Sequence, residues 1–297
     1  MREKLNRFND MKRKSEKMTG IGLTILGIGL LLLLGLYMGG ADNAQILAFI
    51  VIAIGLIIAA AGAAEFSKIK SRFKTEVLSE YFAEAIPGVK YHPEGGLSQT
   101  DVYATEFLKR ADRFHTEDLL QGQMDEVDFI SSDVKLEERH VQHTKNGTRV
   151  YYVTYFLGRV FKFTFNKEFD GQLQVLESGS PLSSRKFQRV ELESIDFNKK
   201  FRTFSTNELS AFYVLTPDIM EAIFALEQRN PGRIGLSFSG DTLYIAINNN
   251  KDTFEIKMFS QINEGIMDEF RKDLLVIQDF VHTLKLNTKI FKSKAKL

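Results

Sequence analysis

The sequence contains no cysteine and no tryptophan among its 297 residues. Without cysteine the chain can form no disulfide, no thiolate metal site and no cysteine nucleophile. Its charges nearly cancel, with 39 Lys and Arg against 38 Asp and Glu. A general nucleic-acid binder needs a basic excess to neutralise phosphates, so we expect no nucleic-acid partner. The 25 phenylalanines must supply much of the aromatic core.

Motifs that carry common chemistries are also missing. The sequence has no phosphate-binding glycine loop, no nucleophile elbow and no zinc-binding HExxH helix. His140 and His143 fall in a predicted hairpin arm, where a three-residue offset places them on opposite faces. Glu191 and Glu193 alternate with apolar residues, which is more typical of an exposed strand face than of an acid–base pair. We therefore predict no catalytic residue, no cofactor and no metal.

Two long apolar runs lie near the N-terminus. Residues 18–40 and 44–64 are stretches of 23 and 21 residues without a charged side chain. At about 1.5 Å per residue, the first reaches roughly 34 Å, enough to cross a hydrocarbon core of about 30 Å. Only residues 41–43 connect the runs, and so short a connection forces an antiparallel hairpin. The sequence therefore predicts a transmembrane helical hairpin over residues 18–64.

The orientation of this hairpin follows from the positions of its flanking basic residues. Seven Lys or Arg residues precede the first run within residues 1–17, four follow the second within residues 68–74, and none lies in the connection. The positive-inside rule places both termini in the cytoplasm. We expect a multi-pass protein of the plasma membrane, with residues 1–17 as a basic cytoplasmic N-terminus.

The apolar runs resemble an anchor more than a transport path. Neither contains an ionisable residue, and ion sites and substrate paths usually need one. Gly35 and Gly39 have the spacing that lets a neighbouring helix approach closely. The partner helix could be the other half of the hairpin or belong to a separate protein.

Residues 65–86 are predicted to form a juxtamembrane amphipathic helix. Apolar residues recur there at spacings of three and four, at Phe66, Ile69, Phe73, Val77 and Tyr81. Four basic residues lie off this stripe and could contact anionic lipid head groups: Lys68, Lys70, Arg72 and Lys74. An ordinary helix that packs on the domain after it explains the stripe equally well.

Residues 87–286 are predicted to form a cytoplasmic α+β domain, followed by a basic tail over 287–297. Alternating patterns predict short strands over 149–156, 159–165, 172–177, 190–192, 201–204, 234–238, 243–247 and 253–259. Three pairs predict tight turns between them: Asn146–Gly147, Asp170–Gly171 and Gly240–Asp241. Residues 196–200 are predicted to be a loop. Ser205 with Glu208, and Thr216 with Pro217, predict helix starts, and a long helix is predicted over 263–286. Block-wise strands with short turns favour an antiparallel sheet with inserted helices.

Several segments, taken in order, resemble a known family. They are Glu117-Asp118-Leu119-Leu120-Gln121-Gly122, Gly158-Arg159-Val160-Phe161, Val190-Glu191-Leu192-Glu193-Ser194, Phe197-Asn198-Lys199, Ala211-Phe212-Tyr213-Val214-Leu215-Thr216-Pro217, and Tyr244-Ile245-Ala246-Ile247 before Phe254-Glu255. Together they resemble the bacterial membrane-protein family called domain of unknown function 3137, over about residues 65–285. The resemblance implies a membrane-anchored cytoplasmic domain with no known reaction. It also implies a LemA-type membrane protein as a partner in a shared envelope complex.

Three functional interpretations remain open. The sequence favours a membrane-anchored cytoplasmic binding or scaffold module without catalysis, whose partners are the lipid bilayer and another membrane protein. A second interpretation is a reader of anionic lipid surfaces, by analogy with pleckstrin-homology-like modules. A third is an enzyme whose site assembles from residues that are distant in the sequence.

Overall fold

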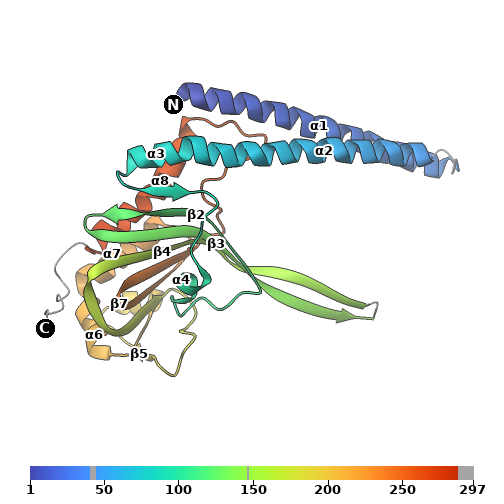
Figure 1. Ribbon diagram of the computed structural model, residues 1–297. Coiled ribbons are helices and arrows are strands. Elements are labelled where there is room, and N and C mark those ends of the chain that lie inside the picture. The colour runs from blue at the N-terminus through green and yellow to red at the C-terminus, as the bar shows by residue number, and fades with distance from the viewer. Residues whose placement is uncertain (41–44, 146, 287–297) are drawn as a thin grey trace. The chain divides into compact units, whose positions relative to one another are not determined.

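The computed structural model describes residues 1–40, 45–145 and 147–286 (Figure 1). The chain folds as two compact units, one formed by residues 1–80 with Glu255–Glu269 and the other by Tyr81–Phe254 with the residues from Phe270 onward. The elements in chain order are α1 (Arg2–Met38), α2 (Gln45–Phe73), a π-helical turn η2 (Lys74–Leu78), α3 (Ser79–Ala85), β1 (Lys90–His92), α4 (Gln99–Tyr103), β2 (Arg113–Met124), β3 (Val127–Thr144), β4 (Gly147–Leu176), β5 (Gln188–Val190), α5 (Ile195–Lys200), β6 (Arg202–Ser205), α6 (Glu208–Val214), α7 (Pro217–Arg229), β7 (Arg233–Asn248) and α8 (Glu264–Thr283).

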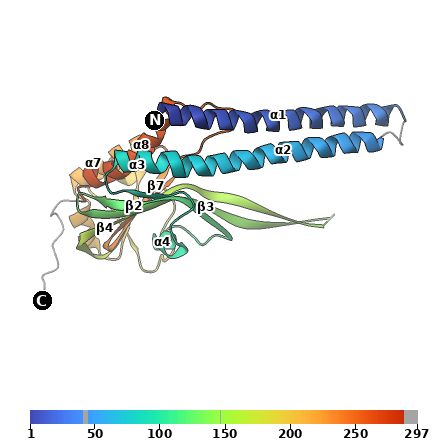
Figure 2. The ribbon, with the colours of Figure 1, turned by 45° about the horizontal axis from the view of Figure 1, so that its top comes forward.

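The first unit is built on a hairpin of two long helices, α1 and α2, which lie side by side in both views (Figures 1 and 2). Both are long and apolar enough to cross a membrane. The buried side of α2 holds a small or apolar residue at every seventh position: Ala48, Gly55, Gly62 and Ile69. A seven-residue repeat keeps one face of a helix against its neighbour. Gly22 lies against Ala59 and Gly29 against Ile52, which confirms the antiparallel pairing expected from the short connection.

The hairpin continues beyond the apolar runs at its basic end. Helix α1 begins at Arg2, so residues 2–17 are helical and continuous with the first run. Phe8 packs edge-on against Phe73, with 5.5 Å between ring centroids, and Ile69 and Val77 are also buried. The helix predicted over 65–86 is confirmed by α2, η2 and α3. Part of its apolar stripe packs against α1.

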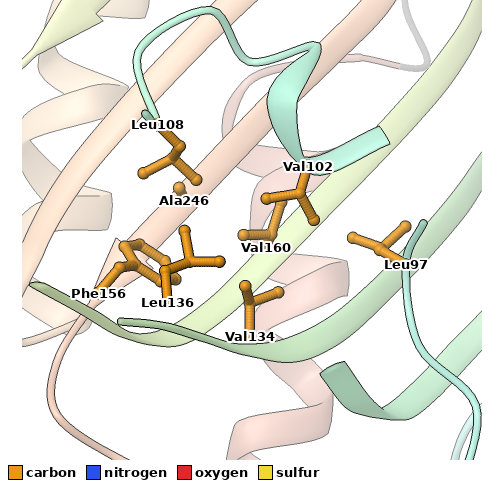
Figure 3. Packing of buried hydrophobic residues seen from close by; sticks show 8 residues of the cluster. All are labelled: Leu97, Val102, Leu108, Val134, Leu136, Phe156, Val160 and Ala246. Atoms are coloured by element: carbon orange, nitrogen blue, oxygen red, sulfur yellow. The ribbon is translucent and has the colours of Figure 1, made fainter. Parts of the chain in front are cut away.

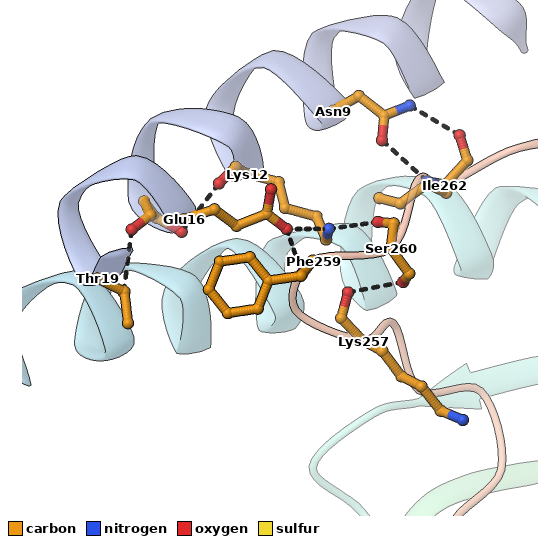
Figure 4. A network of polar contacts seen from close by, with 9 residues as sticks. Asn9, Lys12, Glu16, Thr19, Lys257, Phe259, Ser260 and Ile262 are labelled. Carbon is orange, nitrogen blue, oxygen red and sulfur yellow. Dashed lines mark hydrogen bonds and ion pairs between the residues drawn. The ribbon is translucent and has the colours of Figure 1, made fainter. Parts of the chain in front are cut away.

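Residues Glu255–Glu269 belong to this first unit, and the strand predicted over 253–259 is wrong. Side chains of α1, rather than a neighbouring strand, bond this segment (Figure 4). Asn9 bonds both the N–H and the carbonyl of Ile262, at 2.9 and 2.7 Å. Glu16 accepts from the N–H of Phe259 at 2.6 Å, and the buried ammonium of Lys12 donates to the Ser260 carbonyl. These hydrogen bonds satisfy backbone N–H and C=O groups that a neighbouring strand would otherwise pair with, so the segment forms no strand.

The second unit is an antiparallel sheet whose described strands follow the order β1-β2-β3-β4-β6-β5, with β7 paired to β4. Strands β4 and β7 are longer than predicted, because neither Asp170–Gly171 nor Gly240–Asp241 reverses the chain. Gly171 and Gly240 have φ angles of +91° and +57°. They accompany irregularities in the β4–β7 register, which bend long strands without ending them. The turn predicted at Asn146–Gly147 involves Asn146, which lies outside the described residues.

The two faces of the sheet are covered by different segments. On one face, Phe280 of α8 packs edge-on against Phe161 and Phe163 of β4, at centroid distances of 5.1 and 6.0 Å. On the other face, α4 and the segment around it pack against the sheet and form with it a cluster of buried apolar residues: Leu97, Val102, Leu108, Val134, Leu136, Phe156, Val160 and Ala246 (Figure 3). The α+β class predicted from the sequence is confirmed.

The helices inserted after β5 differ in part from the prediction. Residues 195–200 form α5, capped by the Ser194 hydroxyl, where a loop was predicted. Helix α6 is capped by Asn207 and not by Ser205, whose hydroxyl accepts from the Asn207 N–H at 3.0 Å. The start of α7 after Thr216, with Pro217 in its first turn, is confirmed. Helix α8 confirms the long helix predicted over 263–286.

Candidate functional site

Three charged side chains lie inside the second unit on the sheet face that α8 covers. Asp133 of β3 and Arg159 of β4 are directly opposite each other in the antiparallel register. Asp118 reaches the same place through a β-bulge, because the β2–β3 register shifts between Glu117 and Leu120 and Asp118 has a φ of +57°. Bulges commonly redirect a side chain in this way. All three residues are at most 5% exposed, so a set of charges is buried where a sheet normally buries apolar groups.

Arg159 is the centre of this buried cluster. Its Nη2 donates to the Asp118 carbonyl at 3.0 Å, and its Nη1 lies 3.7 Å from Asp133 Oδ1. The guanidinium also lies over the ring of Phe254, with 4.7 Å from its central carbon to the ring centroid. Burial of a charge costs several kcal/mol per ion unless pairs and hydrogen bonds offset it, and these contacts offset part of that cost for Arg159.

The two buried carboxylates have further polar contacts. The Tyr91 hydroxyl donates to Asp118, and the Thr253 N–H donates to Asp133 Oδ2. One carboxylate oxygen from each of Asp118, Asp133 and Asp252 lies within 4.8 Å of the others. Asp252 is exposed, so the cluster reaches solvent on the side of the chain that follows β7.

Burial governs the protonation of this cluster. Desolvation raises the pKa of Asp133 to about 7; Arg159 opposes the shift and the Asp118 carboxylate adds to it. The pKa of the Tyr91 hydroxyl is also raised, by burial first and then by the charge of Asp118. The cluster can therefore gain or lose a proton near neutral pH, whereas most carboxylates are fully ionised there.

Removal of the Asp133 carboxylate should alter how stability depends on pH. Between about pH 4 and 7 the folded protein keeps a proton that the unfolded chain has released, so stability falls as pH rises through this window and levels off above 7. We expect the unfolding free energy of the wild type, relative to Asp133→Asn, to fall by about 1.4 kcal/mol per pH unit between pH 5 and 7. Denaturant titrations in buffer with a chelator measure this difference. Parallel curves for the two proteins would contradict the shift.

A second feature is a two-stranded ribbon that projects from the sheet (Figures 1 and 2). We define the β3–β4 arm as residues 138–145 and 147–153, of which 138–144 pair with 147–153. Strand β2 pairs with β3 only as far as Glu137, and β7 pairs with β4 only from Gly158 onward. Beyond Glu137, the Arg139 N–H of β3 still donates a hydrogen bond to the Asp112 carboxylate, at 2.7 Å. No other strand among the described residues pairs with the outer edges of the arm.

The arm combines exposed apolar side chains with a basic composition. Its most exposed apolar residues, each more than 40% accessible, are Val141, Val150, Tyr151 and Val153. Residues 139–152 contain three Lys or Arg residues and no Asp or Glu. His140 stacks on Tyr151, with ring centroids 5.4 Å apart, while His143 bonds Thr148. As predicted, the two histidines lie on opposite faces of the strand, because their cross-strand partners are an odd number of residues apart.

Each of the four predicted membrane-contact residues lies beside a carboxylate. Lys68 is close to Glu65 at 3.7 Å, and Arg72 pairs with Glu76 at 3.0 Å. Lys70 and Lys74 both pair with Glu255, and Lys74 is buried. The contact with lipid head groups stays a prediction for the set, and its best candidate is Lys68, which is 74% exposed.

Gly35 and Gly39 do not lie at the contact between the described parts of α1 and α2. A Cβ added at Gly35 would meet nothing within 4 Å, and one at Gly39 would meet only carbonyls of its own helix. Close approach occurs instead at Gly22, Gly29 and Gly55, where an added Cβ would lie within 3 Å of the other helix. A contact of Gly35 and Gly39 with a separate protein stays a prediction.

The buried cluster was not predicted as a site. Asp118 and Arg159 appeared only as members of the segments that resemble the family, and Asp133 was not singled out. One signal was available for Arg159, which lies within the mostly apolar run of residues 155–161; Asp133 follows two serines in a mixed segment that gave no such signal. A charge in such a strand marks a buried partner more often than a solvated face. Glu191 and Glu193 are exposed, but β5 ends at Val190, so they lie beyond the strand and not on its face as predicted.

Together the elements define an α+β protein with an N-terminal helical hairpin that is able to cross a membrane. A family model described as protein of unknown function (DUF3137) matches residues 154–286. The match confirms the family resemblance over residues 154–286; the part of the resemblance from about residue 65 to 153, with Glu117–Gly122, lies outside it.

Comparison with curated proteins gives no match. Among solved structures, the crystal structure of the mycobacterial trehalose monomycolate transport factor A, TtfA, aligns with 76% of this chain and 99% of that chain. The sequence identity is 9% and the TM-score is 0.41. A likeness of this degree transfers no function to the chain.

Proposed function

We propose that this chain is a membrane-anchored binding module that presents the β3–β4 arm to a protein partner. In this proposal the α1–α2 hairpin crosses the plasma membrane of a bacterium twice, with both termini and the sheet unit in the cytoplasm. Support comes from the length and apolarity of the two helices and from the basic residues at only one end of the hairpin.

The unpaired edges of the arm carry the proposal. A strand edge offers free N–H and C=O groups that a second extended chain can bond, a mode called β-augmentation. Proteins usually protect long edges with prolines or bulges, or cover them. The described part of the arm has no proline, and exposed Val141 and Val150 face each other across it. An isolated two-stranded ribbon is marginal in water, so a partner that adds a strand would stabilise it.

The charge of the arm indicates what kind of partner it fits. Arg139, Lys145 and Arg149 have no acidic residue among them, so an acidic extended segment would be favoured and a basic one rejected. The LemA-type membrane protein implied by the family resemblance is one candidate for such a partner. Neither face of the arm is wholly apolar, because polar and apolar side chains mix on both. For this reason we favour a protein over a lipid surface as the occupant.

A single spin label on the arm tests this function, because the natural chain has no cysteine that would react. We expect a label at Val150→Cys to be immobilised in native membranes and mobile in vesicles that contain only anionic lipid. A label at Leu209→Cys on α6, where the native side chain is 81% exposed, serves as the matched control and should stay mobile in both. Electron paramagnetic resonance spectra report the difference.

Charge reversal on the arm separates a specific partner from crowding. With Lys145→Glu and Arg149→Glu added, the label at residue 150 should become mobile in native membranes, because an acidic partner is then repelled. Mobility of the wild-type arm in native membranes would refute the binding function. Immobilisation by anionic vesicles alone would refute the protein partner and favour the lipid-surface interpretation instead.

A further inference from the structure

We propose that the loop of residues 257–261 contacts the membrane and inserts the Phe259 ring at the boundary between lipid head groups and acyl chains. We call these residues the interface loop; they belong to the first unit, together with the hairpin. The inference rests on the membrane crossing proposed above and adds a further contact with the bilayer. The partner is the anionic phospholipid surface that surrounds the hairpin.

The apolar runs of the two helices end at the same level of the hairpin. A Cβ added at Gly62 of α2 would lie 2.6 Å from the Thr19 backbone nitrogen and 3.0 Å from the Ser15 carbonyl oxygen of α1. The first uncharged run begins at Met18 and the second ends at Ala64, so the starts of both charged flanks lie side by side. In the proposed crossing, this level is the edge of the hydrocarbon core.

Hydrogen bonds from α1 hold the interface loop close to this edge. The Phe259 N–H donates to Glu16 at 2.6 Å, and Glu16 lies about 3 Å along the helix from the first residue of the uncharged run. The buried Lys12 ammonium donates both to Glu16 and to the Ser260 carbonyl. Figure 4 shows the Phe259 ring extending from the loop toward Thr19, which is the direction of the uncharged run.

The exposure and backbone conformation of Phe259 also point to a partner. Its side chain is 65% exposed to water, and its φ angle is +61°. A bulky residue rarely adopts a positive φ, and such a conformation persists only where the surrounding structure enforces it. Here the bonds from Glu16 and Lys12 enforce it, and the ring stays in solvent. Insertion among lipid head groups would remove this apolar surface from water.

The charges around the ring fit an anionic lipid surface. Residues 12–17 and 257–261 contain one acidic residue, Glu16, which pairs with Lys12. The exposed charged side chains of these two segments are all basic: Arg13, Lys14, Lys17 and Lys257. Basic residues near the surface of an anionic membrane are attracted to it, and an exposed aromatic ring among them is typical of an interfacial contact.

A single tryptophan tests this contact, because the natural chain has none. The full-length Phe259→Trp variant is reconstituted in vesicles that contain anionic phospholipid. We expect lipids brominated on their acyl chains to quench its fluorescence, and acrylamide in the water to have little effect. Bromines near the head-group end of the chain should quench more than bromines near its methyl end, because interfacial side chains insert only shallowly.

Two further tryptophan variants in α1 calibrate the depth. Leu31 is 72% exposed within the first uncharged run, and Glu3 lies about 22 Å before that run. Leu31→Trp should respond to brominated lipid only, and Glu3→Trp to acrylamide only. If acrylamide quenches Leu31→Trp, the membrane crossing fails and this inference fails with it. If Leu31→Trp behaves as expected while Phe259→Trp responds to acrylamide, or to neither quencher, the interface loop alone is refuted.

Charge reversal tests the contribution of anionic lipid. Lys257→Glu, added to Phe259→Trp, should reduce the quenching by brominated lipid roughly twofold, because the added carboxylate is repelled by the head groups. Arg7→Glu makes the same change in charge on α1, more than a Debye length of about 8–10 Å from the uncharged run, and should leave the quenching unchanged. Equal quenching with both substitutions would refute the anionic surface as the partner.

Discussion

Replacement of Gly55 by leucine is expected to force α1 and α2 apart. A Cβ at this position would already lie 2.6 Å from the Leu26 backbone nitrogen and 2.9 Å from the Gly22 carbonyl. Both obstacles are backbone atoms, so a rotamer change cannot relieve the clash. Overpacking of a tight contact costs about 1–3 kcal/mol and more where the backbone must move. We expect a loss of about 3 kcal/mol or more, which is a large part of a typical folding free energy.

Two glycines of α1, Gly27 and Gly35, provide matched controls for this change in α2. A Cβ at Gly27 or at Gly35 would meet nothing within 4 Å, so Gly27→Leu and Gly35→Leu add the same apolar volume without a clash. Spin labels at Ile28→Cys and Ile50→Cys, whose native side chains are about half exposed, report the distance between the helices. Gly55→Leu should lengthen and broaden that distance, and the controls should not. Equal distances in all four proteins would show that the glycine contact does not hold the hairpin together.

The hairpin illustrates which features the sequence could predict. The length and apolarity of the two runs define the helices, because hydrocarbon accepts only segments of that kind. The contact surface was harder to predict. Gly35 and Gly39 have a familiar spacing, but the helices approach at Gly22 and Gly55, which belong to a seven-residue repeat of small residues. The repeat was present in the sequence, and its extension into residues 5–15 was obscured by the charged residues around them.

The sheet was predicted in its class but not in its connections. Alternation identifies strands, since side chains of a strand point to opposite faces in turn. It cannot decide whether a glycine such as Gly171 reverses a strand or only bends it, because a positive φ serves both purposes. Alternation also predicted a strand over residues 253–259, which the structure does not contain. Its alternation reflects burial, while Asn9 and Glu16, far away in the sequence, bond its backbone.

The buried cluster lay beyond local analysis of the sequence. Asp118 points inward only because a bulge shifts the register between β2 and β3, and bulges have no reliable sequence signature. Asp133 and Arg159 meet only when two strands pair in one register. Local patterns therefore predict the elements, whereas the site depends on pairings between distant segments.

Truncation of Phe280 is expected to destabilise the sheet unit strongly. This side chain is fully buried, and its ring packs nearly perpendicular to the rings of both Phe161 and Phe163 of β4. Phe280→Ala removes the ring that packs against the stacked pair Phe161 and Phe163, and because both are fixed on one strand they cannot fill the space, so a cavity remains. Such changes cost about 3–5 kcal/mol. For a unit of roughly 200 residues, this lowers the midpoint of thermal unfolding by about 10 °C.

Phe212 of α6 offers the same substitution at an exposed position of the same unit. Its side chain is 42% accessible, so Phe212→Ala should change stability by only about 0.5 kcal/mol. Thermal unfolding followed by circular dichroism at wavelengths dominated by the sheet compares the two variants. If Phe280→Ala unfolds at the same temperature as Phe212→Ala, then α8 does not stabilise the sheet. If the midpoint falls as expected, α8 and β4 unfold together, because loss of the helix exposes the whole row of phenylalanines that it covers.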